Sequence, residues 1–365
     1  MILLILLGLL LRLSLLFVDY SWDVHNHISW AEDAWRHGFQ GFYETQSTNV
    51  FAWLFPNYPP LSIFIFYLTY PLRDILFQLF WWLNLTIPFF PSKLIFFLNE
   101  RVFLAAVMKI PGVLGDLGLA YIIYLFVKKH APKNKRLLWL FPSLVLFNPV
   151  FIFHSSLWGQ IDTLVLFFVL ASSYLLLFTK KYIFAMIVFT LSILLKPTPL
   201  VFAPVFIMYI LKKYGVRKTM EAFFYSTIVF YISFIPFFQK GNFLLYPWQT
   251  YYFKIIEAQS LSYVTNGALN FWALLVGLQK GVTDTTPFFL NIPYRVWGYI
   301  LVGLFSVSVC WKFIRSKITP QNFFIACFLI SSFAVLFLTK MHERYTLLPL
   351  PFLLLYSINR LKDLR

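Results

Sequence analysis

Long apolar runs, separated by short polar or basic segments, follow one another along the whole chain. Hydrophobic residues make up 60% of the 365 positions, and charged residues only 12%. A helix needs roughly 20 apolar residues to cross the hydrocarbon core of a membrane, because backbone groups without partners in lipid cost several kcal/mol each. This pattern excludes a soluble globular protein, and we expect an all-α polytopic membrane protein of about 11 transmembrane helices.

The chain contains no internal repeat and no low-complexity linker, so we expect one membrane domain over residues 1–365. Its two long loops cover residues 19–60, the first outer loop, and residues 239–293, the second. We expect an amphipathic helix within the first loop. The apolar stretch at 269–278 in the second loop is expected to enter the membrane without crossing it. Prolines interrupt residues 61–99 unevenly, and we expect two short crossings there.

The net charge of +16 comes largely from short basic clusters between the apolar runs. Cytoplasmic loops of membrane proteins carry an excess of Lys and Arg. We therefore interpret these clusters as cytoplasmic loops beside membrane lipids, and we expect no binding of nucleic acid. The clusters are residues 128–136, 180–181, 212–218, 312–317 and 360–365.

Helices that alternate between these clusters place the remaining polar segments together on the outer side. The densest segment, residues 19–44, holds five of the 14 acidic residues and three of the six histidines. Asp23 and His27 are four residues apart, so one helical turn brings them to the same face. A partly desolvated aspartate beside imidazole and indole groups such as that of Trp30 is suited to general-base catalysis. The alternative is a solvated loop with interfacial tryptophans.

Three further outer segments carry groups that bind sugars or phosphates. Tyr58 precedes two prolines and opens the next apolar run, which is also typical of a simple helix start. Gln160 and Asp162 follow a glycine and offer hydrogen bonds to sugar hydroxyls, although Asp162 is also placed to cap the following helix. Lys196 ends an apolar run, where its ammonium group binds either lipid phosphates in general or one specific phosphate.

Residues 340–345 combine two strong cations, an acid and a histidine between two apolar runs. The positive-inside rule does not explain Lys and Arg on the outer side. An anionic ligand does, because the Arg344 guanidinium offers a bidentate fork to phosphate and His342 can share a proton with it. The alternative is an internal ion pair between Glu343 and Arg344.

One long apolar run carries three charged residues: Arg101, Lys109 and Asp116. Lys109 and Asp116 are seven residues apart and therefore share a helix face. We expect the two to form an internal charge pair, with direct contact to a substrate as the alternative.

These motifs, in this order, resemble those of the GT-C superfamily of polytopic glycosyltransferases, and in particular the dolichyl-phosphate-glucose glucosyltransferases and their prokaryotic relatives. That family has a catalytic aspartate in its first outer loop, seven residues before a tryptophan, as Asp23 and Trp30 stand here. Its Y-P-P-L element is similar to residues 58–61, its K-Q-M element to residues 196–198, and its late H-E-K element to residues 342–344.

The resemblance implies a GT-C-like fold and a polyprenyl-phosphate sugar as donor. It implies that Asp23 removes the proton of the acceptor hydroxyl and that the anomeric centre is inverted. The departing phosphate would be stabilised by His342, Arg344 and Lys196. The residues expected to contact the substrates are His27, Trp30, Tyr58, Gln160 and Asp162. The family's G-H-F-Q-Y-N element is replaced here by residues 158–162, so the identities of the sugar and of the acceptor do not carry over.

The expected partners are a polyprenyl-phosphate hexose and a hydroxyl on a lipid-linked glycan, a surface polymer or a protein. We expect a prokaryotic cell membrane rather than the endoplasmic reticulum. No cofactor is expected, and a divalent metal bridging Asp19 and Asp23 is unnecessary beside the basic phosphate partners. The alternative function is a transporter or flippase of a lipid-linked anionic glycan, a class in which internal repeats are common.

Overall fold

The computed structural model of the protein describes residues 1–47, 55–258, 260–278 and 281–361. Parts of both long loops, residues 48–54, 259 and 279–280, lie outside the described residues. The described chain is helical and contains no β-strand. Its helices of eight or more residues are α1 (Ile2–Leu15), α2 (Trp22–His37), α3 (Pro60–Thr69), α4 (Leu72–Thr86), α6 (Arg101–Met108), α7 (Ile110–His130), α8 (Lys135–Leu146), α10 (Asp162–Phe178), α11 (Tyr182–Leu195), α12 (Ala203–Tyr214), α13 (Val216–Phe234), α16 (Tyr294–Arg315), α17 (Pro320–Phe337) and α18 (Leu350–Leu361).

Several shorter helical segments connect these helices. Two of them are π-helical, η1 and η4, and the others are single α-helical or 3₁₀ turns. They are α5 (Lys93–Asn99), α9 (Pro149–Ile152), η1 (Phe153–Trp158), η2 (Thr198–Phe202), η3 (Ile235–Phe237), α14 (Tyr246–Gln249), η4 (Thr250–Ile256), α15 (Phe271–Val276), η5 (Phe289–Asn291) and η6 (Glu343–Leu347). The helix within residues 269–278 is α15, and its six residues are too few to cross a membrane.

Membrane-spanning helices make up the body of the molecule. Within the described residues, five helices are long and apolar enough to cross a membrane, or six if the bent pair of α8 and α9 with η1 counts as one. The apolar helices α1, α10 and α11, of 14 to 17 residues, are shorter than that. The protein is therefore a helical membrane protein, and the expectation of about 11 crossings is not confirmed. Apolar runs in the sequence do not show how many residues each helix finally contains.

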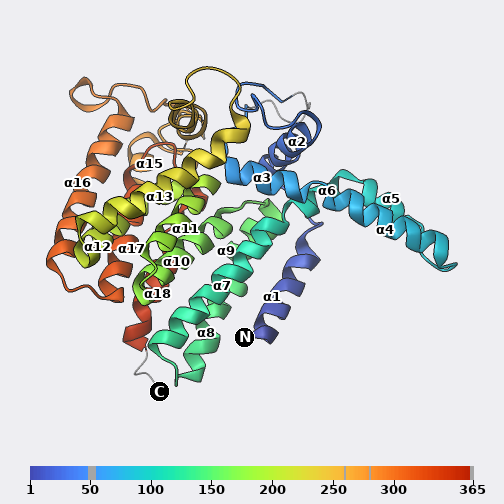
Figure 1. The fold of residues 1–365 in the computed structure, drawn as a ribbon, viewed down its shortest axis with the longest axis horizontal. Coiled ribbons are helices and arrows are strands. Elements are labelled where there is room, and N and C mark those ends of the chain that lie inside the picture. The colour runs from blue at the N-terminus through green and yellow to red at the C-terminus, as the bar shows by residue number, and fades with distance from the viewer. Residues whose placement is uncertain (48–54, 259, 279–280, 362–365) are drawn as a thin grey trace.

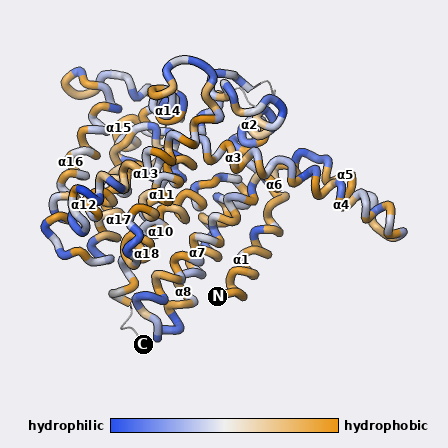
Figure 2. Tube along the Cα trace, viewed as in Figure 1, coloured by the Kyte–Doolittle hydropathy of each residue, from blue (hydrophilic) through white to orange (hydrophobic). Residues whose placement is uncertain are grey.

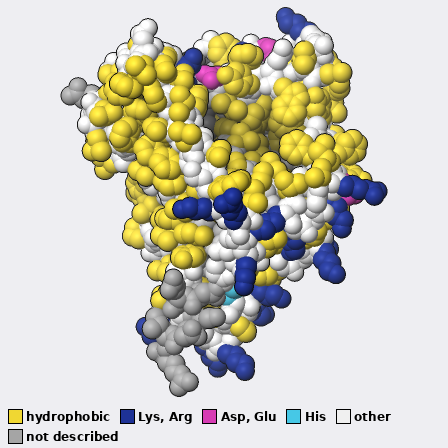
Figure 3. All heavy atoms as spheres, turned by 90° about the vertical axis from the view of Figure 1, so that its left-hand side faces the viewer, with side chains coloured by type: hydrophobic (Ala, Val, Ile, Leu, Met, Phe, Trp, Pro, Cys, Tyr) yellow, Lys and Arg dark blue, Asp and Glu magenta, His cyan; other side chains and the backbone are white. Residues whose placement is uncertain are grey.

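Basic clusters meet at one end of the molecule. The Lys218 ammonium lies 5.7 Å from the centre of the Tyr182 ring, and Lys212 donates a 3.3 Å hydrogen bond to the carbonyl oxygen of Phe313. The N-terminus, the end of α18 and the turn between α7 and α8 lie at the same lower end in Figure 1. Most of the Lys and Arg side chains visible in Figure 3 are in the lower half of that face. We refer to this as the basic end; the positive-inside rule assigns it to the cytoplasm.

A helical arm extends sideways from the opposite end. Figure 1 shows α3, α4 and α5 running across the direction of α7, with α4 and α5 reaching beyond the rest of the molecule. No residue of α4 is buried, and Figure 2 shows that the arm is largely hydrophobic. Residues 60–86, which are α3 and α4, form one of the five candidate membrane spans, so the two short crossings that we expected in residues 61–99 are not confirmed. Their prolines lie between helices: Pro71 separates α3 from α4, and Pro88 and Pro91 lie between α4 and α5.

Glycines allow α7 and α10 to pack closely along their length. A Cβ atom at Gly115 would lie 2.3 Å from the backbone nitrogen of Leu164, and one at Gly112 would lie 2.4 Å from the carbonyl oxygen of Gln160. Both distances are far below van der Waals contact, so neither position accepts a side chain without moving backbone. Small residues at helix interfaces permit this approach of two backbones.

A buried ion pair joins α1 to α7. The Arg12 Nε lies 2.6 Å from Oδ2 of Asp116, which also accepts a 2.6 Å hydrogen bond from Ser155. Asp116 thus does not pair with Lys109, and that expectation was wrong. A seven-residue spacing fixes the face of a helix but not the neighbour that covers it. The Lys109 ammonium instead donates hydrogen bonds to three backbone carbonyls, those of Leu16, Asp19 and Ser156.

Candidate active site

Helix α2 carries Asp23 and His27 on one face. The helix begins after Ser21 and ends at Gly38, whose φ of 77° suits a residue without a Cβ. The expected amphipathic helix is present, with one face exposed, at Trp22 and Trp35 among others, and the other face packed against the protein. Val24 and Ala31 are fully buried within it. One face of α2 is therefore packed into the protein, and Asp23 lies next to a closed interior.

The turn after η1 brings Gln160 to Asp23. Gly159 has φ of 83°, and a Cβ atom there would lie 2.3 Å from Cγ2 of Val24 on α2. Only glycine therefore fits, both for its conformation and for its close approach to α2. The Nε2 of Gln160 donates a hydrogen bond to Oδ2 of Asp23. The π-helical turn η1 precedes this site, as such turns often do at functional positions.

Lys196 and Asp162 form a buried ion pair behind Gln160. The Lys196 Nζ lies 3.0 Å from both carboxylate oxygens of Asp162 and donates a 2.9 Å hydrogen bond to Oε1 of Gln160. His154 Nε2 lies 2.7 Å from Oδ2 of Asp162, and the Tyr58 hydroxyl donates a 3.2 Å hydrogen bond to Gln160. The Asp162 side chain does not cap α10. Gln160 and Asp162 therefore hold Asp23 and Lys196 in position.

Arg344 completes the surroundings of Asp23 from the far end of the chain. Its Nη1 lies 3.3 Å from Oδ2 of Asp23. This pair replaces the alternative of an ion pair between Arg344 and Glu343. The interaction joins η6 to α2, so the first outer loop and the late basic segment meet as the sequence predicted.

A small polar cavity of about 50 Å³ lies at this junction. Its walls come from α2, from residues 57–58, from the end of α11 and from η6. A water molecule needs at least about 10–15 Å³ of such space, so the cavity has room for water but not for a hexose. The residues that line it are Asp23, Asn26, His27, Trp30, Asn57, Tyr58, Lys196, Arg344 and Tyr345.

His27 faces this cavity without a hydrogen-bond partner. Neither of its ring nitrogens has a partner in the described structure, although the side chain is buried. Its ring stacks on that of Phe66, with centres 4.3 Å apart. Burial lowers the pKa of His27 to about 3. The imidazole is therefore neutral at pH 7 and offers one donor and one acceptor to whatever occupies the cavity.

The charge of Asp23 is maintained by its neighbours. Burial raises the pKa of this carboxyl, but the surrounding positive charges, Arg344 first, lower it by more, so the pKa lies below the ordinary value of 3.8. Burial lowers the pKa of Lys196, and the Asp162 carboxylate opposes that effect. Asp23 is thus ionised at neutral pH and lies between two cationic side chains.

His342 lies near the polar cavity, within electrostatic range of Arg344 and Asp23, but does not line it. Its Nε2 lies 2.8 Å from the Ser260 hydroxyl oxygen. Asn266 donates a 3.0 Å hydrogen bond to the same hydroxyl. Burial lowers the pKa of His342 to about 4. The second long loop, to which we assigned no role from the sequence, therefore supplies Ser260 and Asn266 beside this histidine.

Two apolar cavities adjoin the polar one. The first, of about 220 Å³, shares Tyr345 with the polar cavity and includes Ser260 and Lys340 in its walls. The second, of about 350 Å³, is almost entirely apolar and shares Leu200 and Ile256 with the first. Figure 3 shows hydrophobic side chains around a hollow in the upper half of the molecule. A polar centre thus continues into apolar space.

Sequence motifs named most of the polar lining, but the predicted site residues did not include Asn26, Asn57 or Tyr345. Each of these lies next to a predicted residue in the sequence: His27, Tyr58 or Arg344. Among the described residues, no group of three or more His, Cys, Asp or Glu side chains is arranged to hold a metal ion. No model of a known protein family matches this chain, and a search of curated proteins finds no significant match.

Proposed function

We propose that the protein is a membrane glycosyltransferase of GT-C type that transfers a hexose from a polyprenyl phosphate to a hydroxyl acceptor. The observation that carries this proposal is the position of Asp23. It is an ionised, partly exposed carboxylate that lines a small polar cavity, with the cations Lys196 and Arg344 on the same cavity wall. A base for a hydroxyl and cations for a phosphate are the groups that such a transfer needs.

The reaction is a single displacement at the anomeric carbon. Asp23 accepts the proton of the acceptor hydroxyl as its oxygen bonds to the sugar. The bond between the anomeric carbon and the phosphate oxygen breaks, and its electron pair remains on the phosphate. Arg344 and Lys196 stabilise the added negative charge, and the configuration of the anomeric carbon is inverted.

Substrate binding must rearrange the contacts of Asp23. The cavity of about 50 Å³ is too small for a hexose, and the Asp23 carboxylate is already bonded to Gln160 and Arg344. A donor phosphate that pairs with Arg344 draws this cation away from Asp23. The pKa of Asp23 then rises, because burial is less opposed, and the carboxylate becomes a stronger base. The adjoining apolar cavities are suited to the lipid part of the donor.

The test offers the purified protein, in lipid nanodiscs, a panel of polyprenyl-phosphate glucose, mannose and galactose together with total membrane glycolipids as acceptors. Mass spectrometry follows the release of polyprenyl phosphate. We expect one donor to turn over, and Asp23→Asn to reduce kcat by roughly 10²- to 10⁴-fold. Binding of polyprenyl phosphate alone, measured by thermal shift, should survive the substitution.

Glu32→Gln provides the matched control. Glu32 is an acid on the same helix, paired with Arg36 at 2.6 Å and outside the cavity, so its loss should leave turnover unchanged. Full activity of Asp23→Asn would overturn the assignment of the base. Binding of the donors without breakdown of any of them would favour the transporter or flippase instead.

A further inference from the structure

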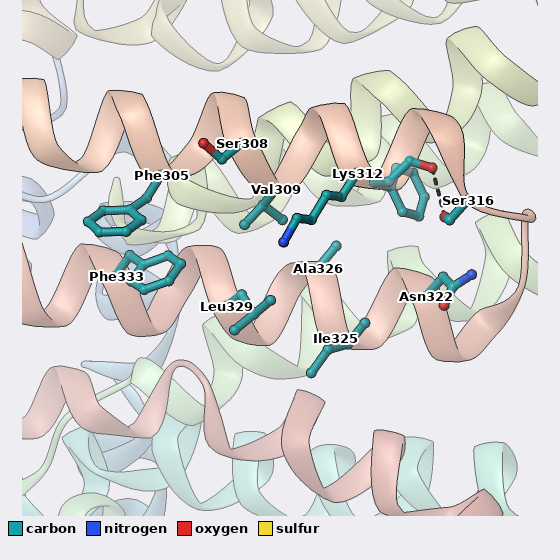
Figure 4. Close-up of a pocket in the computed structure, with 11 residues that line it drawn as sticks. Phe305, Ser308, Val309, Lys312, Ser316, Asn322, Ile325, Ala326, Leu329 and Phe333 are labelled. Atoms are coloured by element: carbon teal, nitrogen blue, oxygen red, sulfur yellow. Dashed lines mark hydrogen bonds between the residues drawn. The ribbon is translucent and has the colours of Figure 1, made fainter.

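A groove of about 420 Å³ runs between α16 and α17, far from Asp23 in the fold. Its walls are mainly apolar and include Val309, Ile325 and Leu329 (Figure 4). At one end the rings of Phe305 and Phe333 stack, with centres 4.2 Å apart. The groove therefore lies between two helices, is lined mainly by apolar side chains and is bounded at one end by stacked aromatic rings.

The other end of the groove is polar. Ser316 and Asn322 lie there, at the connection between α16 and α17. This connection belongs to the basic end, because Lys212 donates hydrogen bonds to the backbone carbonyls of Phe313 and Ser316. Lys212 thus binds the free carbonyls at the end of α16, as cations commonly do.

Lys312 has no such partner. Figure 4 shows its side chain leaving α16 and its ammonium group ending inside the groove, beside Val309 and Ala326. Within the part of the chain that the structure describes, this ammonium makes no hydrogen bond and no ion pair. Lys312 is exposed at the last turn of α16, so its ammonium group is accessible from outside the groove that it lines. The groove therefore combines an accessible positive charge with an apolar wall, which complements an anionic lipid.

We propose that this groove binds one anionic glycerophospholipid of the cytoplasmic leaflet. Its phosphate pairs with the Lys312 ammonium, and an acyl chain follows the apolar wall towards Phe305. Three observations carry this assignment: the unpaired cation in the groove, its place at the basic end, and the apolar length beyond it. Basic pockets between membrane helices at the cytoplasmic side are suited to anionic headgroups. The site is separate from the polar cavity and does not depend on the proposed transfer.

Native mass spectrometry of the full chain, titrated with phosphatidylglycerol or with phosphatidylcholine of the same acyl chains, tests the proposal. We expect one phosphatidylglycerol to remain bound under conditions that remove phosphatidylcholine. Lys312→Ala should weaken this binding about fivefold, the effect of one basic residue near an anionic surface. Lys312→Arg should retain it. Lys133→Ala, which removes an exposed lysine of the same basic end, should change nothing.

A second variant keeps the test independent of the charge. Ser308→Phe fills the groove from α16 while Lys312 stays in place, and it should also remove the bound lipid. Unfolding temperatures in a zwitterionic detergent establish that each variant is folded. Equal binding of both lipids, or unchanged phosphatidylglycerol binding in Lys312→Ala, would overturn the proposal. Preferential retention of polyprenyl phosphate over phosphatidylglycerol would also overturn it, and so would a dimer in place of a lipid adduct.

Discussion

The Nη1 atom of Arg344 lies 3.3 Å from Oδ2 of Asp23, and 321 positions of the sequence separate the two residues. This pair closes the polar cavity between the first outer loop and η6. It also controls the ionisation of Asp23, since Arg344 contributes most to lowering the pKa of the carboxyl. In the proposed transfer the two groups act on different substrates. Asp23 accepts the proton of the acceptor hydroxyl, and Arg344 stabilises the donor phosphate.

Arg344→Gln should shift the acid limb of the pH–activity profile to higher pH. Without this cation, burial raises the pKa of Asp23, and an opposite charge at such a distance is worth about 1–3 pH units. Because transfer needs the carboxylate, activity is lost as the pH falls, and the loss begins at a higher pH than in the wild type. The measurement is kcat/KM against pH. Arg344→Lys keeps the charge and should keep the limb near its wild-type position, whereas coinciding limbs in wild type and Arg344→Gln would contradict the pairing.

Lys196→Met should destabilise the protein, because it leaves the Asp162 carboxylate buried without its cation. Removing one partner of a buried ion pair costs about 3–5 kcal/mol. The double variant Lys196→Met with Asp162→Asn should recover part of that loss, since no uncompensated charge remains. Thermal unfolding in detergent measures both. Losses that simply add in the double variant would show that the pair is not coupled.

Stability should decrease below neutral pH because of His27. Its pKa is 6.5 for the ordinary side chain and about 3 in the fold, so the unfolded chain binds a proton that the folded protein excludes. The stabilisation is complete above pH 6.5 and is lost as the pH falls from 6.5 towards 3, on the order of 2 kcal/mol by pH 5. Unfolding temperatures between pH 7.5 and 5 test this. His27→Gln should flatten the dependence, and His37→Gln, at an exposed position of the same helix, should not.

Gly115→Leu should disrupt the packing of α7 on α10, because the added side chain meets the backbone of Leu164. Overpacking of this kind costs about 1–3 kcal/mol. Gly303→Leu places the same side chain on α16, where a Cβ meets no atom within 4 Å, and should be close to neutral. Comparison of the two unfolding temperatures checks the prediction. Equal unfolding temperatures would mean that the close contact between α7 and α10 does not contribute to stability.

The sequence predicted the helices that carry strong apolar runs, from α7 to α13 and from α16 to α18, because burial in lipid requires such runs. It also predicted that Asp23, Lys196 and Arg344 lie on one side of the membrane, since helices alternate between the basic clusters. The sequence did not predict the hydrogen bonds that join these residues. They depend on the turn at Gly159, and a turn's geometry depends on contacts with α2 that no local pattern records.

Two parts of the fold could not be derived from local pattern. The partner of Asp116 is Arg12, about a hundred residues earlier, and helix periodicity does not show which helices become neighbours. A lone arginine in an apolar run was the available signal, because a buried charge needs a partner. The arm of α4 and α5 was also missed. Its composition is that of a crossing helix, and only its direction across α7 distinguishes it (Figure 1).

The arm has a consequence for how the molecule meets its surroundings. It extends from one flank, and α16 stands at the opposite flank (Figure 1). The apolar cavity that shares Tyr345 with the polar centre includes Tyr299 of α16 in its wall. If the proposed transfer takes its donor lipid into this cavity, the lipid arrives at the flank opposite the arm, and contacts made by α4 and α5 do not compete with it.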